Sequence, residues 1–242
     1  ENKENSQLGF CLTGSAGSGK SAVFAKLYSE LEKKDIWLLA NAAGPGAKST
    51  DVDSLLERWI GELCANLGLK NPITKQEEII ERELLGDDKN KPNRSEELEN
   101  TFRILLYQAS EQKQVVVLID ALDQMEQTNR SRYLNWLPTI WPENARLIAT
   151  AIPGTQIESF AKRERMELME LPLLEQKTAE EIVKEICNKY HRELNPEVLD
   201  IILRKEKNGI PALSNPLWLS MAIEELNLID SDDFAYADKE YK

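Results

Sequence analysis

Apolar residues along the chain gather in two kinds of stretch, short continuous runs and longer runs at helical spacing. Five short runs are predicted to be strands: 8–13, 36–40, 115–120, 146–151 and 166–171. The stretches between them repeat apolar residues every three or four positions, as Val23, Leu27 and Leu31 do. Strands that are apolar on both faces need helices on both sides. The pattern therefore predicts an α/β fold, with a doubly wound, mostly parallel five-stranded sheet between helices in three layers.

The second predicted helix covers 51–69, with Ser49 or Thr50 as its N-cap. After the last strand the pattern turns entirely helical. Three helices are predicted there: 178–190, 196–205 and 216–228. We therefore expect an α/β domain over 1–172 and a small helical lid subdomain over 173–242.

Acidic residues outnumber basic ones by 42 to 30, which gives a formal net charge of −12 at pH 7. Nucleic-acid surfaces and anionic-membrane surfaces need clustered positive charge, so this balance argues against both. Two segments carry most of the excess: 74–99 has nine acidic and five basic residues, and 224–242 has seven and two. We expect 74–99 to be an exposed loop between two helices.

The three cysteines lie far apart and show no metal-ligand spacing. This favours reduced, intracellular thiols over a zinc site or a disulfide framework. The longest strongly apolar run, 115–119, is far shorter than the roughly 20 residues that a membrane helix needs. The polar N-terminus has no hydrophobic signal region. We therefore expect a cytoplasmic protein, and the missing initiator Met indicates a fragment of a longer chain.

One segment fits the phosphate-loop motif G-x-x-x-x-G-K-[ST] in full, directly after the first strand and before the first helix. It consists of Gly14, Ser15, Ala16, Gly17, Ser18, Gly19, Lys20 and Ser21. Its glycines allow backbone N–H groups to approach a phosphate beside the positive end of the helix dipole. We assign the segment to nucleotide binding, with Lys20 at the β- and γ-phosphates and Ser21 at Mg²⁺.

The strand 115–120 ends in a carboxylate. Asp120 has the form of the Walker B aspartate that holds Mg²⁺ directly or through water. Three positions on, Asp123 is the candidate for orienting or deprotonating the attacking water, with a turn or N-cap role as the alternative. The predicted catalytic residues are thus Lys20, Asp120 and Asp123, and the predicted metal ligands are Ser21 and Asp120.

Four segments together resemble the nucleotide-binding core of STAND-class P-loop NTPases. They are 14–21, 118–124, 145–154 and 215–219. The nearest likeness is to the NACHT-like modules of nephrocystin-3, telomerase-associated protein and prokaryotic regulatory ATPases, and it covers nearly the whole chain in order. The resemblance implies a P-loop NTPase fold followed by a helical lid, and an ATPase whose turnover is slow and regulatory.

The resemblance also implies ligands and partners. The expected cofactors are ATP or ADP and Mg²⁺, and the nucleotide state is expected to control signalling through self-association of the full-length protein. Effector and sensor domains are expected outside these residues. A proline of the helical subdomain packs near the adenine in the family, and Pro216 matches it, with Pro211 as a competing candidate. An N-K-x-D motif for guanine is missing, because His191 stands where the aspartate belongs.

One departure from the family pattern concerns the γ-phosphate sensor. Many relatives have an arginine just after the fourth strand, where this chain continues from Thr150 to Ala151. The sensing role then falls to Thr150 or to an arginine from elsewhere, or hydrolysis is slow. Four arginines are candidates, with a solvated helix face as the alternative for each: Arg130, Arg132, Arg163 and Arg165.

Two other functions stay open at this stage. One is a module that holds nucleotide and oligomerises without turnover. The other is a P-loop small-molecule kinase, which usually has a basic lid, and no arginine-rich lid stands out here. We expect His191 to cap a helix end rather than to take part in catalysis. Three tryptophans are expected to pack in the core rather than to stack on a base: Trp136, Trp141 and Trp218.

Overall fold

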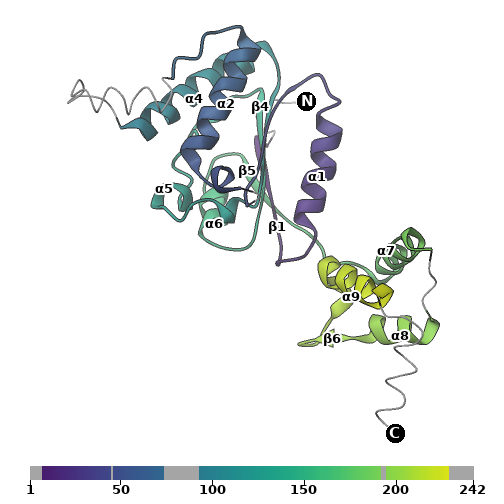
Figure 1. Cartoon of the computed structure of the whole chain (residues 1–242). Helices are drawn as coiled ribbons and strands as arrows, with labels where there is room; N and C mark the ends of the chain where they lie inside the picture. Colours follow the sequence, from purple (N-terminus) through teal and green to yellow (C-terminus); the bar gives the residue numbers. More distant parts are fainter. Residues whose placement is uncertain (1–6, 45, 74–92, 192–194, 229–242) are drawn as a thin grey trace. The chain divides into compact units, whose positions relative to one another are not determined.

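The computed structural model describes residues 7–44, 46–73, 93–191 and 195–228 (Figure 1). Their contacts divide the chain into two compact units. The first unit contains the chain up to Thr13 together with Lys20–Glu170. The second contains Gly14–Gly19 together with the chain from Leu171 onward. The phosphate loop is therefore grouped with the helical part of the chain.

The first unit is built on a five-stranded sheet in which every pairing is parallel. Its strands are β1 (Gly9–Thr13), β2 (Trp37–Ala42), β3 (Val115–Asp120), β4 (Ala145–Ala151) and β5 (Met166–Glu170). Their order across the sheet is β2-β3-β4-β1-β5. This confirms the predicted α/β fold, and each strand lies within about two residues of its expected bounds.

Strand β4 lies between β1 and β3 and pairs with both. Cys11 of β1 is opposite Ala149, and Ala149 is opposite Ile119 of β3. Because the strands run parallel, Thr13 at the end of β1 and Asp120 at the end of β3 reach the same edge of the sheet. The end of β1, which leads into the phosphate loop, and Asp120 at the end of β3 are thus separated there by the width of one strand, β4.

Helices cover both faces of this sheet, with α1 on one face and α2 and α4 on the other (Figure 1). The helices of the first unit are α1 (Lys20–Leu31), α2 (Val52–Leu67), α4 (Arg94–Gln112), α5 (Asn129–Arg132) and α6 (Thr155–Ala161), with 3₁₀ turns η2 (Ala47–Ser49) and η3 (Leu122–Gln124). Helix α2 buries a stripe of apolar residues against α4 and the sheet, as its spacing predicted.

The N-cap of α2 differs from the expectation. Asp51 caps the helix, because its side chain accepts a hydrogen bond of 2.7 Å from the Ser54 N–H. Ser49 instead accepts from the N–H groups of Gly44 and Gly46, at 3.1 and 3.2 Å, and so closes the turn that precedes the helix. Because Asp51 is the N-cap, α2 starts at Val52, one residue later than expected.

Aromatic side chains form the centre of the core in the first unit. Trp59 of α2 is fully buried, with its ring centroid 5.6 Å from that of Phe102 of α4 and 6.3 Å from that of Trp136. Trp141 is also buried. The expected core packing of Trp136 and Trp141 is therefore confirmed, and truncation of such a buried aromatic residue typically costs about 3–5 kcal/mol.

The expectation of an exposed loop over 74–99 is wrong for its last residues. Arg94–Glu99 form the first turns of α4, where Leu98 is completely buried. Asn93 caps this helix by accepting from the Ser95 N–H. The acidic residues of these turns favour the positive helix N-terminus, so a dense charge pattern here marks a helix start rather than a loop. The rest of the segment, 74–92, lies outside the described residues.

The second unit is not entirely helical, contrary to the expectation. Between its helices α7 (Gln176–Lys189), α8 (Pro196–Arg204) and α9 (Pro216–Leu228), it contains a hairpin of β6 (Glu206–Lys207) and β7 (Ile210–Pro211), followed by the 3₁₀ turn η4 (Ala212–Ser214). The hairpin turn is Asn208-Gly209, with φ of 55° and 76°. An Asn-Gly pair favours this two-residue turn because both residues tolerate positive φ. The expected helix bounds are met within about two residues.

A separate apolar cluster holds the second unit together. It joins α7, α8, η4 and α9 through Ala179, Val183, Cys187, Ile202, Leu213, Leu219 and Ile223.

His191 follows the C-terminal end of α7 in a left-handed conformation (φ 53°), and its backbone N–H donates to the Asn188 carbonyl. Within the described ranges, each helix is too short or too polar to cross a lipid bilayer.

All three cysteines are buried free thiols. Burial, and to a smaller extent the charge of Asp123, raise the pKa of the Cys11 thiol to about 12, against an opposing effect of Lys20. Burial also raises the pKa values of Cys64 and Cys187. The thiolate is the reactive form, so these cysteines are chemically protected in the native protein.

We predict that iodoacetamide labels none of the cysteines in the native protein at neutral pH and labels all three in denaturant. Because folding raises the Cys11 pKa, the neutral thiol contributes stability that is complete below pH 9 and is lost as the pH rises towards 12. Wild type should therefore lose more unfolding free energy over this range than Cys11→Ala, as measured by urea unfolding. Equal losses would contradict the raised pKa.

Candidate nucleotide-binding site

The phosphate loop has the local structure that its motif predicts. Gly14–Gly19 connects the end of β1 to α1, which begins at Lys20. Gly17 and Gly19 have φ of 77° and 97°, a region that favours glycine. A Cβ at Gly14 would lie 2.9 Å from the Ser18 Oγ. The loop therefore needs glycine for its conformation and for close packing, which suits a backbone that approaches a phosphate.

Within the second unit, the phosphate loop is hydrogen-bonded to the start of α9. The Asn215 side-chain amide donates to the Ala16 carbonyl at 3.0 Å, and the Leu217 N–H donates to the Gly17 carbonyl at 3.2 Å. A Cβ added at Gly17 would come within 2.7 Å of Asn215 Oδ1. These contacts join two segments that are about 200 residues apart in sequence.

Asn215 also caps α9, because its Oδ1 accepts from the Trp218 N–H at 3.1 Å. Pro216 is the first residue of the helix, and its Cγ would lie 3.7 Å from a Cβ at Gly19. The sequence placed both residues in the segment 215–219 that resembles the family, but only Pro216 was assigned a role and Asn215 was not. An asparagine directly before a proline at a helix start is an N-cap signal that could have identified it.

In the first unit, Asp120 is held by a neighbouring strand. Its side chain is 7 % exposed, and one carboxylate oxygen accepts a hydrogen bond from the Thr150 hydroxyl of β4. The same hydroxyl accepts from the Ala121 N–H at 2.9 Å. Ala121 has a φ of 54°, so the chain turns sharply just after the carboxylate. Thr150 therefore positions Asp120 and the turn that follows it.

Asp123 lies in η3, and its Oδ1 accepts from the Ile152 N–H at 2.9 Å. Asp123 therefore has the turn role that was predicted as an alternative, because this hydrogen bond joins η3 to the residue that follows β4. The charges of Asp123 and Lys20 both act on the Cys11 thiol. The structure thus brings the two charged candidates to the same region of β1.

The candidate sensor arginines are occupied in structural contacts. Arg130 pairs with Asp53, at 2.6 Å, and with Glu99. Arg163 donates to backbone carbonyls, among them that of Pro138 at 2.6 Å, and its burial lowers its pKa. The expected solvated helix face is therefore wrong for both arginines. Two further contacts of candidate arginines are Arg132 with Gln127 and Arg165 with Glu143.

A hollow of about 450 Å³ lies beside the loop within the second unit. Its lining includes Ser15 of the loop, Pro211 of the hairpin and Trp218 of α9. The Lys205 ammonium lies 6.0 Å from the centre of the Trp218 ring. Trp218 is only partly buried, so the expectation of core packing holds for one part of this side chain while another part lines the hollow. The volume is in the range of small-molecule pockets.

The described residues contain no group of three or more His, Cys, Asp or Glu side chains that could hold a metal ion. Magnesium at a nucleotide site does not need such a group, because phosphates and water supply most of its ligands. One hydroxyl and one carboxylate are a suitable protein contribution. Ser21 at the start of α1 and Asp120 at the end of β3 are of these chemical types.

Two solved structures have a fold similar to that of this chain. A Walker-type ATPase of Pyrococcus abyssi matches with a TM-score of 0.53 and 15% identity, over 98% of this chain and 67% of that chain. A DNA replication initiation factor matches with a TM-score of 0.50 and 16% identity, over 99% of this chain and 60% of that chain. The likeness at these identities concerns the fold.

The chain belongs to the nephrocystin 3, N-terminal family, whose model matches residues 1–151. A TPR repeat-containing protein of Dictyostelium discoideum is 22% identical over 240 residues, which is 90% of this chain and 14% of the relative. NACHT and WD repeat domain-containing protein 2 of Mus musculus is 33% identical over 63 residues, 26% of this chain and 4% of the relative. The chain thus spans a small part of both relatives, and together the matches support a NACHT-like module with a P-loop NTPase fold.

We predict that Asn215→Ala lowers the free energy of unfolding by about 1–2 kcal/mol, because it removes both the α9 cap and the bond to the phosphate loop. Asn215→Asp keeps the cap acceptor and loses only the amide donor, so it should cost less than Asn215→Ala. Urea unfolding measures both values. Asn188→Ala, at an exposed site of α7, is the control, and an equal loss in the control would contradict the role of Asn215.

Proposed function

We propose that this chain binds ATP or ADP with Mg²⁺ at the phosphate loop, hydrolyses ATP slowly, and acts as a signalling switch whose nucleotide state controls self-association of the full-length protein. The observation that carries the proposal is the pair of hydrogen bonds that Asn215, directly before α9, and Leu217 of α9 donate to the loop carbonyls of Ala16 and Gly17. A change in the loop conformation has to break these bonds or move α9. Phosphate binding is thereby coupled to the helical unit.

The orientation of the loop peptides supports phosphate binding. In a trans peptide the carbonyl and the next N–H point in opposite directions, and the described chain has no cis peptide. The Ala16 carbonyl faces the Asn215 amide, so the Gly17 N–H is directed away from it. A backbone donor on that side is suited to an anion at the start of α1, where the helix dipole is also positive.

We assign the chemistry of the site to the residues that the motif singled out. Ser21 and Asp120 would hold Mg²⁺, which would neutralise charge on the phosphates. Lys20 would stabilise the charge that develops on the transferred phosphoryl group. Asp123 keeps its fixed Oδ1 on the Ile152 N–H and would use Oδ2 to orient the attacking water. Thr150 would act indirectly, by holding the Asp120 carboxylate in place.

We assign the base to the hollow beside the loop. Ser15 connects this hollow to the phosphate loop, and Pro211 and Trp218 supply apolar walls for a flat ring. Pro216 would contribute from the loop side, because it lies against Gly19. Both proline candidates would thus belong to the nucleotide site, at different ends of it. We favour adenine because the chain lacks the guanine motif and resembles ATP-dependent switches.

The kinase alternative is less well supported. A small-molecule kinase usually covers its substrates with a basic lid. The described part of the helical unit contains one arginine, Arg204, and its side chain pairs with Asp200 at 2.8 Å. The switch proposal needs no acceptor site. We place the effector and sensor domains of the full-length protein outside these residues, and its expected location is the cytoplasm.

We predict that saturating ATP or ADP with Mg²⁺ stabilises the wild-type chain. Ligand at about 100 times its Kd adds about 2.7 kcal/mol, which raises the melting temperature by roughly 5–10 °C for a domain of this size. Lys20→Ala should lose this gain, whereas Lys26→Ala, an exposed lysine of the same helix, should keep it. Thermal unfolding with ATP, ADP and GTP tests this. A wild type that neither contains nucleotide nor gains stability from one rules out the proposal.

We predict that Asp123→Asn retains ATP binding and loses most hydrolysis, by about 10²-fold or more, because the amide still accepts from Ile152 but no longer takes a proton. Phosphate release measures turnover, and thermal unfolding with ATP measures binding. Asp35→Asn, at an exposed carboxylate, is the matched control. Unchanged turnover removes Asp123 from the catalytic residues. A wild type that binds ATP without any turnover favours the alternative of a nucleotide-holding module.

A further inference from the structure

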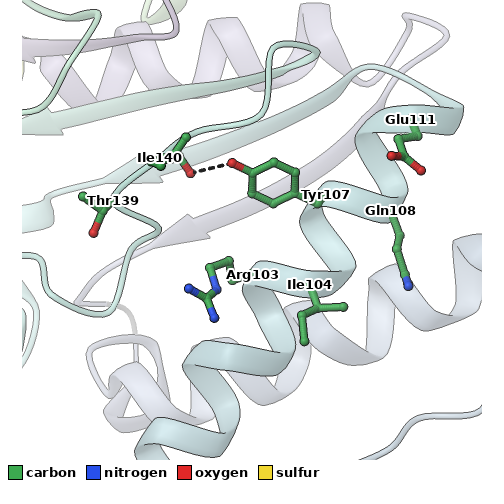
Figure 2. A pocket seen from close by; sticks show the side chains of 7 residues that line it. All are labelled: Arg103, Ile104, Tyr107, Gln108, Glu111, Thr139 and Ile140. Carbon is green, nitrogen blue, oxygen red and sulfur yellow. Dashed lines mark hydrogen bonds between the residues drawn. The ribbon is translucent and has the colours of Figure 1, made fainter.

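The outer surface of α4 carries a groove that the nucleotide site does not use. It has a volume of about 500 Å³ and lies between α4 and the segment that leads into β4 (Figure 2). Its lining residues are Arg103, Ile104, Tyr107, Gln108, Glu111, Thr139 and Ile140. All of them belong to the first unit, so the groove is a feature of one compact body.

Large apolar side chains are exposed together at this groove. Ile140 is 73 % exposed, Ile104 is 54 % exposed and Tyr107 is 38 % exposed. The Tyr107 hydroxyl donates to the Ile140 carbonyl at 3.3 Å, which holds the segment against the helix (Figure 2). A cluster of this kind on a folded surface is typical of a contact with another protein.

The charges at the groove have a regular arrangement. Arg103 lies at one end and Glu111 at the other, with Tyr107 between them (Figure 2). Each charge is four residues from Tyr107, about 6 Å along the helix axis. Among the described residues, the Arg103 guanidinium bonds only to the Asn100 side chain, and the Glu111 carboxylate has no hydrogen bond or ion pair. Both charges are thus available to a partner.

We propose that this groove binds a second copy of the same chain, with the two α4 helices antiparallel across a two-fold axis at Tyr107. In this arrangement Arg103 of each copy faces Glu111 of the other, so one contact gives two ion pairs. A two-fold interface requires a surface that is complementary to itself. Opposite charges at equal distances from a central aromatic residue meet that requirement, whereas a different partner imposes no such symmetry.

The size of the groove sets the strength of the pairing. Seven residues line it, whereas a stable interface of standard size uses roughly 20–30 residues from each side. We therefore assign a weak dimer, with a dissociation constant on the order of 100 µM. Domains outside these residues would raise the local concentration in the full-length protein. This contact is distinct from the nucleotide-controlled self-association proposed above, and it needs no nucleotide, so it stands or falls separately from the proposed ATPase function.

Charge reversal gives a direct test by sedimentation velocity, over about 10 µM to about 1 mM of the chain without nucleotide. We expect a monomer–dimer equilibrium in wild type. Arg103→Glu and Glu111→Arg should each weaken it about tenfold or more, by placing like charges together. The double variant that exchanges the two charges should restore it to within about threefold. Lys162→Glu, at an exposed residue directly after α6 and with the same charge change as Arg103→Glu, should have no effect.

A second test places a cysteine at the proposed two-fold axis. In Tyr107→Cys the new thiols of the two copies lie next to each other, so mild oxidation should join them in a disulfide-linked dimer. The background should be low, because the natural cysteines are buried. Tyr28→Cys, at a similarly exposed tyrosine of α1, should not cross-link. Circular dichroism confirms the folding of each variant. A wild type that stays monomeric at every concentration, or a charge exchange that fails to restore the dimer, overturns the proposal.

Discussion

Asp120 ends a strand in which every residue is buried, and a carboxylate in such a place needs a hydrogen-bond donor. Thr150 of the adjacent strand supplies that donor and also accepts from the Ala121 N–H. The arrangement depends on the strand order, because only a strand next to β3 places a hydroxyl at this position. With β4 between β1 and β3, the phosphate loop after β1 and the carboxylate after β3 begin at the same edge of the sheet.

The second constraint is the pair of hydrogen bonds between the start of α9 and the phosphate loop. The loop is short and rich in glycine, so it gains order from contacts that its own side chains do not provide. Asn215 provides one with its amide and uses its oxygen to start α9. One residue thus serves both the helix and the loop. A loop that is held from the helical unit suits a protein in which phosphate binding and helix position are coupled, which is the basis of the proposed switch.

Much of the fold was predictable because burial leaves a local pattern. Strand β3 is apolar throughout since both of its faces are covered, and α2 repeats its apolar residues at the period of its buried face. The structural predictions that were wrong concern polar residues, which can serve either in solvent or in a specific contact. The acidic turns at Arg94–Glu99 belong to a helix that is buried on one side. Asn208-Gly209 makes a hairpin turn in a region that was predicted to be entirely helical. Arg130 is a partner of Asp53 and Glu99 rather than a solvated charge.

The sequence by itself determined the order along the chain of the five strands of the parallel sheet, the place of the phosphate loop after the first strand, and the carboxylate that ends β3. Each of these depends on neighbouring residues, whose spacing and chemistry are visible along the chain. Only the tertiary structure decided that Thr150 holds Asp120 and that Asn215 holds the loop, across 30 and 199 positions of sequence. It also exposed Arg103 and Glu111 on either side of Tyr107. Such contacts depend on strand order, on helix packing and on the direction of each side chain, which arise only when distant segments are brought together.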